Sequence, residues 1–421
     1  MMSSTDTTPT GEPPQDASEG RKLRAAFVTL FDASDVTKMS GTGYNISQAL
    51  IREGLELEFI GSLHKKITPS NVLKHGINRF LLRKNDMPQR DTAFLKHYAR
   101  QVEQQLEGLD VDLIFASGTL PISYLNTDLP LVLWTDCTFE NLLDYYPRYC
   151  NLSKRSIRDG HAADKAVYER LDHAIFTSSW AADSAIKHYG MDPVHTSIVS
   201  RGANVPAGRT EADIEALIDA RPKDKCILHF VGIDWLRKGG DIALRAAELL
   251  NQRGIPTELR VAGVEPETDG PVPDFVKPLG YVSKSTPEGL ERFMKLMGEA
   301  HFMILPTRAD AYGFAFLEAS AFGVPSLAPN TGGVPLVSID GVNGCIFDYD
   351  DRGEGYADKI ESLFNDPGAY KELAMRAFRD HLERGNWDVV GKQLMQIVRR
   401  VVDERGSNPA HGAHAGARVT T

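Results

Sequence analysis

Residues Leu305 to Gly333 combine residue types that can bind a phosphorylated ligand. The segment LPTRADAYGFAFLEASAFGVPSLAPNTGG contains an apolar strand, a loop with Asp310, then Gly313 and a helix with Glu318. Glycine lets the backbone approach a ligand, and a free helix N-terminus presents N–H groups to an anion. A carboxylate accepts two hydrogen bonds side by side, which suits paired sugar hydroxyls. We favour this use of Glu318 over the alternative of a buried structural Glu with a partner inside the fold.

A second loop, FVGIDWLRKGG from Phe230 to Gly240, places Arg237 and Lys238 at the entry to a helix. Cations are unfavourable at a helix N-terminus, and an anionic ligand would remove this conflict. Two solvated surface charges are the alternative interpretation. Together with Asp310 and Glu318, the two cations favour a ligand that carries phosphate.

The first half of the chain offers two weaker candidates. Residues Ser40 to Tyr44 (SGTGY) join a strand to a helix, but they lack the third glycine of a dinucleotide-binding fingerprint and the lysine of a Walker A loop. A plain tight turn is an equal alternative. Asp136 follows the end of a predicted strand, which is where parallel sheets bind ligands. Its alternative role is to cap the next helix.

The elements that must position these residues alternate between strand and helix. In the first half, strand patterns lie at residues 25–31, 57–60, 112–116, 131–134 and 174–177, with helical patterns at 44–53, 92–106 and 164–171. In the second half, strand patterns lie at 226–231, 258–262, 302–305, 325–328 and 345–347. Strands separated by helices predict right-handed crossovers and parallel sheets. We therefore expect an α/β protein with two Rossmann-like, doubly wound domains that face a central cleft.

Length and composition set outer bounds. The chain has 421 residues, which exceeds the usual size of one hydrophobic core. Its net charge of −10 argues against a dedicated nucleic-acid binder. Neither the four cysteines nor the twelve histidines have metal-ligand spacing, so we expect no metal. No segment approaches the roughly 20 apolar residues of a membrane span, and the cysteine usage fits a reducing cytosol.

Taken together, these residues resemble the retaining, GT-B-fold nucleotide-sugar glycosyltransferases of glycosyltransferase family 4, the group 1 glycosyltransferases. The hallmark of that family is two acidic residues separated by seven, here Asp310 and Glu318, followed by a small-residue helix and a strand. The resemblance continues through TGGVP at 331–335, DGVNG at 340–344 and RKGG at 237–240, and it covers about residues 24–400.

The resemblance implies a role for each candidate. Lys238 and Arg237 would hold the diphosphate, Glu318 would bind the ribose hydroxyls, and Asp310 with the backbone of 313–315 would hold the donor sugar and distal phosphate. The implied catalytic set is Asp136, Asp310 and Lys238. The implied donor-binding set is Gly43, Arg237, Lys238, Val282, Asp310, Gly313, Phe314, Ala315 and Glu318. Such enzymes need no metal, so we expect no cofactor besides the nucleoside-diphosphate sugar.

The resemblance implies two further roles, and this sequence departs from the family pattern at three positions. The resemblance places Gly43 facing the phosphates from the first domain and Val282 in the pocket of the base. The family usually has Glu in place of Asp310, Arg in place of Ile233 and His in place of Asp136. An ionised Asp accepts hydrogen bonds but cannot donate them.

The expected organisation combines the composition of the two ends, the pattern of strands and helices, and, for the last helix, the family resemblance. It comprises a disordered leader at 1–20, an acceptor-side domain at 21–205, a nucleotide-sugar domain at 206–385, a final helix crossing back to the first domain at 386–405, and a flexible tail at 406–421. The expected activity is transfer of a sugar, with retention, to a glycan, lipid-linked or small-molecule acceptor. The alternatives are a glycoside phosphorylase or synthase on the same fold and a sugar-nucleotide-binding protein without turnover.

One basic segment concerns the acceptor. Between residues 65 and 84, lysines and arginines interleave with apolar residues at helical spacing. A weak contact with an anionic membrane surface would suit a cytoplasmic protein that is peripheral at the inner membrane face. We favour the alternative, in which this face packs on its own domain.

Overall fold

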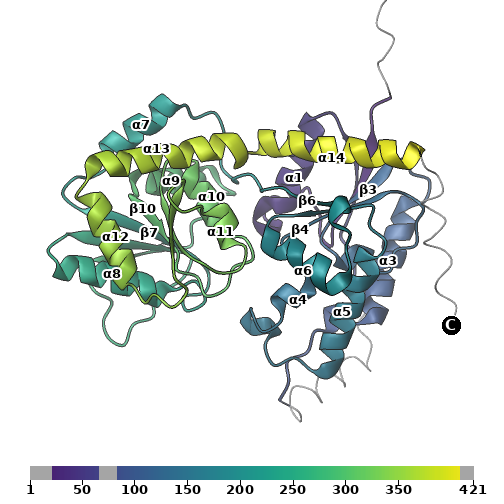
Figure 1. The fold of residues 1–421 in the computed structure, drawn as a ribbon, viewed down its shortest axis with the longest axis horizontal. Coiled ribbons are helices and arrows are strands. Elements are labelled where there is room, and N and C mark those ends of the chain that lie inside the picture. Colours follow the sequence, from purple (N-terminus) through teal and green to yellow (C-terminus); the bar gives the residue numbers. More distant parts are fainter. Residues whose placement is uncertain (1–20, 66–82, 408–421) are drawn as a thin grey trace, which may run out of the picture.

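The computed structural model describes residues 21–65 and 83–407, which form two α/β domains side by side (Figure 1). Each domain holds a six-stranded sheet with helices packed on it. The strand pairings in both sheets are parallel. The predicted two-domain α/β architecture is confirmed.

The first domain has the strand order β2-β1-β3-β4-β5-β6. Its strands are β1 (Arg24–Val28), β2 (Glu56–Ile60), β3 (Leu113–Ser117), β4 (Leu131–Thr135), β5 (His173–Phe176) and β6 (Thr196–Ile198). Its helices are α1 (Thr42–Arg52), α3 (Thr92–Leu106), α4 (Phe139–Leu142), α5 (Lys154–Tyr168) and α6 (Ser179–Tyr189).

The second domain has the strand order β12-β11-β10-β7-β8-β9. Its strands are β7 (Cys226–Val231), β8 (Thr257–Ala262), β9 (Val276–Gly280), β10 (Phe302–Ile304), β11 (Ser326–Pro329) and β12 (Gly344–Phe347). The helices from this point on are α7 (Glu211–Ala220), α8 (Gly240–Gln252), α9 (Pro287–Glu299), α10 (Phe314–Ser320), α11 (Val334–Val337), α12 (Glu354–Phe364), α13 (Pro367–Arg384) and α14 (Trp387–Ser407).

The order of the second sheet determines where its site lies. The chain runs from β7 outward through β8 to β9, and then returns to the other side of β7 to form β10. Ligands of doubly wound sheets bind at such a switch point, outside the carboxyl ends of the two diverging strands. The loops after β7 and β10 therefore meet at the natural ligand position.

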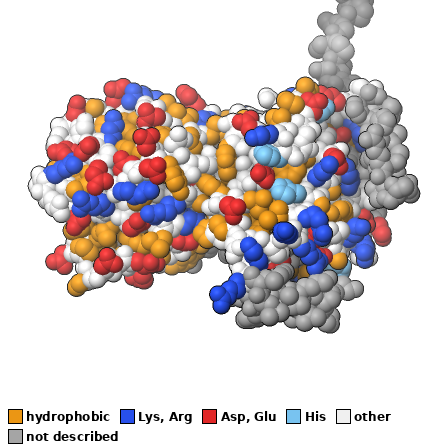
Figure 2. Space-filling model, turned by 60° about the horizontal axis from the view of Figure 1, so that its bottom comes forward, with side chains coloured by type: hydrophobic (Ala, Val, Ile, Leu, Met, Phe, Trp, Pro, Cys, Tyr) orange, Lys and Arg blue, Asp and Glu red, His pale blue; other side chains and the backbone are white. Residues whose placement is uncertain are grey.

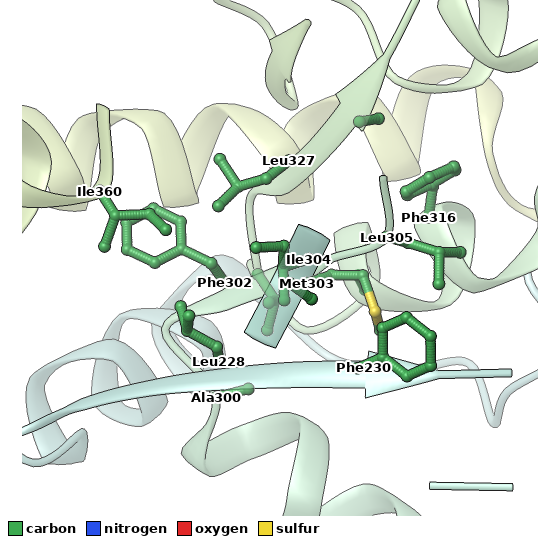
Figure 3. Close-up of a cluster of buried hydrophobic side chains, with 14 of the residues drawn as sticks. Leu228, Phe230, Ala300, Phe302, Met303, Ile304, Leu305, Phe316, Leu327 and Ile360 are labelled. Carbon is green, nitrogen blue, oxygen red and sulfur yellow. The ribbon is translucent and has the colours of Figure 1, made fainter. Parts of the chain in front are cut away.

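Strand β10 lies at the centre of the second domain's core because β7 and β11 pair with its two edges. Phe302 aligns with Leu228, and Ile304 aligns with Leu327. Figure 3 shows these side chains gathered with Phe316 of α10, and all five are fully buried. A short, continuous apolar run is typical of a parallel strand covered on both faces. This packing fixes the end of β10, from which the Asp310 loop (residues 305–313) starts.

The C-terminal helix α14 packs on the first domain, in line with α13 on the second (Figure 1). The ring of Trp387 meets that of Trp134 edge-on, with centroids 6.3 Å apart, and its Nε1 donates to Oδ1 of Asn204 at 3.1 Å. A Cβ on Gly391 would lie 2.9 Å from the carbonyl oxygen of Ala49, so this glycine permits the close approach of α14 to α1. The last helix thus joins both domains.

Three elements differ from the sequence-based expectation. The edge strands β6 and β9 were not predicted, because β6 lacks buried residues and β9 contains the exposed Lys277 and Pro278. Helix α5 begins ten residues before the expected start at Asp164, where Ser153 caps it by accepting the N–H of Ser156. Charged residues in its first turns conceal the helical period.

Three sequence-based expectations fall wholly or largely on parts of the chain outside the described residues. The proposed leader at 1–20 and almost all of the basic segment at 65–84 are not described, nor is the tail beyond 407. Within 21–65 and 83–407, no helix is both long and apolar enough to cross a membrane.

We predict that Trp387→Ala lowers the free energy of unfolding by about 3–5 kcal/mol, because it empties the contact between α14 and the first domain. Trp387 is only 8% exposed. Urea titration followed by circular dichroism measures the loss. Leu382→Ala on α13, where the side chain is 41% exposed, is the control and should change stability by less than about 0.5 kcal/mol. Equal stabilities of the two variants would contradict the prediction.

Candidate functional site

A cleft of about 860 Å³ lies between the domains at the carboxyl ends of their strands. The second domain lines it with loops after β7, β8, β9 and β10. The first domain contributes Val36, Thr37, Gly41, Tyr44, Asn45, Asp136 and Tyr146. The predicted site residues that line it are Asp136, Arg237, Lys238, Val282, Asp310, Gly313, Phe314, Ala315 and Glu318. The structure thus brings together every predicted site residue except Gly43.

Gly43 lies on α1 and is buried. A Cβ at this position would lie 3.0 Å from the ring of Phe31. Gly41, which precedes α1 with a φ of 76°, lines the cleft together with Tyr44 and Asn45. Gly41 rather than Gly43 is therefore the glycine that lines the cleft, and the role expected of Gly43 toward the phosphates stays a prediction.

Lys238 and Asp310 form an ion pair at the switch point of the second sheet. Lys238 comes from the loop after β7 and Asp310 from the loop after β10, and both side chains are largely buried. A Cβ on Gly239, whose φ is 76°, would overlap the carbonyl of Pro306, so only glycine lets the two loops approach this closely.

Arg237 braces the Asp310 loop from the same side. Its Nη1 donates to the carbonyl oxygen of Ala309 at 2.9 Å, and its guanidinium lies 5.7 Å from the ring centroid of Tyr146. The nearest carboxylate is that of Asp234, 3.5 Å away and half-exposed. Arg237 is therefore the cation of this loop that is the least neutralised by the protein.

Glu318 is buried on α10 and forms an ion pair with Lys284. Burial raises the pKa of the Glu318 carboxyl above its ordinary value, and the Lys284 ammonium opposes this shift. Lys284 also donates to the carbonyl oxygen of Asn204 at 3.4 Å and lies 5.1 Å from the ring centroid of Phe293. Sequence reasoning missed Lys284, because no local pattern connects it with a helix more than thirty residues further on.

Asp136 does not cap the next helix. Thr138 caps α4, and the side chain of Asn141 completes a capping box with it. Asp136 instead accepts hydrogen bonds from Nε of Arg201 at 2.8 Å and forms an ion pair with Nη2 at 2.7 Å. The buried Arg201 guanidinium stacks 4.7 Å from the ring centroid of Trp134. Arg201, which pairs with Asp136, is thus the second partner of a cleft carboxylate, after Lys284, that the sequence did not reveal.

Part of the cleft lining in the second domain is apolar. It includes Val231, Val282 and Phe293, with His229 of β7 among them. Burial lowers the pKa of His229 to about 4, and Arg260 adds to the effect, so its imidazole is neutral at neutral pH. Such a wall suits a flat aromatic group rather than a charged one.

Among residues 21–65 and 83–407, no group of three or more His, Cys, Asp or Glu side chains is arranged to hold a metal ion. On the face shown in Figure 2, acidic and basic side chains are interspersed over the second domain. This face carries no basic footprint there of the kind that nucleic-acid binders show.

Two facing Rossmann-like domains with a site between them define the GT-B class of fold, and solved structures support this. The chain matches the sucrose-phosphate synthase of Thermosynechococcus elongatus with a TM-score of 0.66 at 16% identity, over 91% of this chain and 100% of that chain. It also matches HepE of Anabaena, solved with UDP and glucose, with a TM-score of 0.55 at 14% identity, over 90% and 100% of the two chains. The predicted GT-B fold is confirmed.

Two family models match the domains separately. The model of Glycosyltransferase Family 4 matches residues 42–205, and the model of Glycosyl transferases group 1 matches residues 225–366. The family resemblance drawn from the sequence is confirmed: both domains of the chain match the family 4, or group 1, glycosyltransferases.

Curated relatives match this chain in sequence over part of their length. The D-inositol 3-phosphate glycosyltransferase of Rhodococcus jostii is 28% identical over 249 residues, which are 56% of this chain and 54% of the relative. The chain therefore spans about half the length of the curated relatives that it matches.

We predict that the stability of Glu318→Gln minus that of the unchanged protein increases as pH rises from about 4 to 7. A carboxyl whose pKa is raised by folding favours the folded state while it is protonated, and this contribution is lost as pH rises through the folded pKa. Glutamine does not titrate, so the variant escapes the loss. Melting temperatures across this pH range measure the difference.

The control for this series is Glu372→Gln, which removes an exposed carboxylate on α13. It should show no comparable trend. A difference between Glu318→Gln and the unchanged protein that shrinks or turns negative as pH rises would contradict the prediction.

Proposed function

We propose that this chain transfers a sugar from a nucleoside diphosphate to a hydroxyl acceptor, with retention of configuration at the anomeric carbon. The observation that carries the proposal is the meeting of Arg237, Lys238, Asp310 and Glu318 in one cleft between two Rossmann-like domains. Group 1 glycosyltransferases match the domain that supplies these four residues.

In this proposal the loops of the switch point hold the donor. Lys238 and Arg237 neutralise the diphosphate, and the charge that grows on it as the sugar departs is stabilised by cations already in place. Glu318 accepts hydrogen bonds from the ribose, and the apolar wall near Val282 covers the base. Asp310, held by Lys238, takes the hydroxyls of the donor sugar.

The acceptor belongs on the first-domain side of the cleft. Asp136 faces the cleft there, and a carboxylate accepts hydrogen bonds from the hydroxyls of a sugar or polyol. Because curated relatives carry the name D-inositol 3-phosphate glycosyltransferase, this inositol phosphate is the first acceptor to test. Contact of residues 65–84 with an anionic membrane, and a peripheral cytoplasmic location, stay predictions from the sequence pattern alone.

Thermal-shift screening of UDP, GDP, ADP and their sugars tests donor binding. We expect one nucleotide series to stabilise the protein, by about 2.7 kcal/mol when the ligand is present at 100 times its Kd. Nucleotide release with a panel of acceptors then measures turnover. Stabilisation by none of these nucleotides would contradict the proposal, and binding without turnover would favour a non-catalytic binding protein.

We predict that Lys238→Ala lowers kcat by about 100- to 1,000-fold, because it removes a fixed charge from the departing diphosphate. The matched control is Lys225→Ala, which removes a lysine just before β7, at the opposite end of that strand, where Lys225 pairs with Glu258 at 2.9 Å. Turnover of the control should equal that of the unchanged protein. An unchanged kcat in Lys238→Ala would remove the assigned role.

A further inference from the structure

The Asp310 loop of the second domain is held by two tyrosines of the first domain. The backbone N–H of Asp310 donates to the Tyr145 hydroxyl at 2.9 Å, and that hydroxyl lies 3.2 Å from the carbonyl oxygen of Asp310. The N–H of Ala311 donates to the Tyr146 hydroxyl at 2.6 Å. Both tyrosines lie just after α4, and 165 residues separate each from its partner. These bonds exist only while the domains are in contact.

The two phenol groups are themselves fixed in place. The rings of Tyr145 and Tyr146 pack edge-to-face with centroids 5.2 Å apart, and the ring centroid of Trp180 also lies 5.2 Å from that of Tyr145. The Tyr145 hydroxyl also bonds Oγ1 of Thr331 at 3.1 Å. Because the rings are held by these contacts, their hydroxyls move with the first domain, and the loop that they bond follows that domain.

The double glycine at 332 and 333 makes room for this contact. A Cβ on Gly332 would overlap both the Tyr145 hydroxyl and the carbonyl of Asp310. A Cβ on Gly333 would overlap the carbonyl of Ala311 and lie 3.1 Å from Oγ of Ser178 in the first domain. The glycines therefore allow the tyrosine hydroxyl to reach the backbone of the loop.

The next residue of the loop is tied to the first domain as well. The Tyr312 hydroxyl accepts the backbone N–H of Arg201 at 2.6 Å and bonds Oγ of Ser200 at 2.7 Å. Three consecutive loop residues, 310 to 312, thus bond to residues that precede the second sheet in the chain. Their first member carries the carboxylate that pairs with Lys238.

We propose that Tyr145 and Tyr146 are positioning residues that couple closure of the cleft to the geometry of Asp310. When the first domain contacts the loop, the two hydroxyls fix the backbone of 310–311 and so aim the carboxylate at the donor. When the domains separate, the loop loses these bonds and the donor site is incomplete. This role rests on the proposed function, because the aimed group is the one assigned to the donor sugar.

Hydrogen–deuterium exchange of the full chain without ligand tests the coupling directly. In Tyr145→Phe, Tyr146→Phe and the double variant, amides in a peptide spanning 308–314 should exchange on the order of tenfold faster, because each loses a hydrogen bond. Peptides from β7 should not change. Tyr349→Phe is the matched control, since its hydroxyl donates to the carbonyl of Arg308 at 3.3 Å from within the second domain.

Kinetics test the positioning role. With the best nucleotide sugar, the tyrosine variants should keep the nucleotide Kd within about twofold. Their kcat should fall about tenfold, because one lost hydrogen bond corresponds to roughly this factor. Tyr349→Phe should keep both values. A merely structural role would change neither kcat nor its ratio to donor KM. Exchange or kcat equal to that of the unchanged protein overturns the inference. Absence of nucleotide binding by the unchanged protein overturns the proposed function instead, and the exchange result still decides the coupling.

Discussion

The ion pair between Lys238 and Asp310 is the interaction on which the site depends. It forms because β7 and β10 are neighbours in the sheet although some seventy residues separate them in the chain. A largely buried pair is costly to desolvate and gives little stability by itself, so its presence favours a functional reason. The core around Phe302, the glycine at 239 and the brace from Arg237 all serve to keep these two loop ends together.

The other charges of the cleft follow the same rule. Lys284 pairs with Glu318, and Arg201 pairs with Asp136. The protein itself thus supplies Lys238, Lys284 and Arg201 with carboxylate partners. Under the proposed function, a diphosphate would compete with these carboxylates for the cations. Arg237, which has the weakest carboxylate contact, would be the first cation available to it.

The sequence predicted those features that local pattern encodes. Buried strands are continuous apolar runs, and Asp310, Glu318 and Lys238 stand at fixed distances from glycines within their own loops. Edge strands β6 and β9 carry no such runs. The partners Lys284, Arg201 and Tyr145 come from distant elements, so only the fold brings them to the site. Local pattern also does not distinguish Gly43, where a Cβ would meet Phe31, from Gly41, which lines the cleft.

The chain passes between the domains twice, and the two crossings lie side by side. The N–H of Ala203 donates to the carbonyl of Gly385 at 2.8 Å, and a Cβ on Gly202 would overlap the ring of Trp387. Two parallel covalent connections that are bonded to each other resist twisting and sliding, but they still permit rotation about one line. The two connections therefore restrict relative motion of the domains mainly to a hinge rotation about one axis.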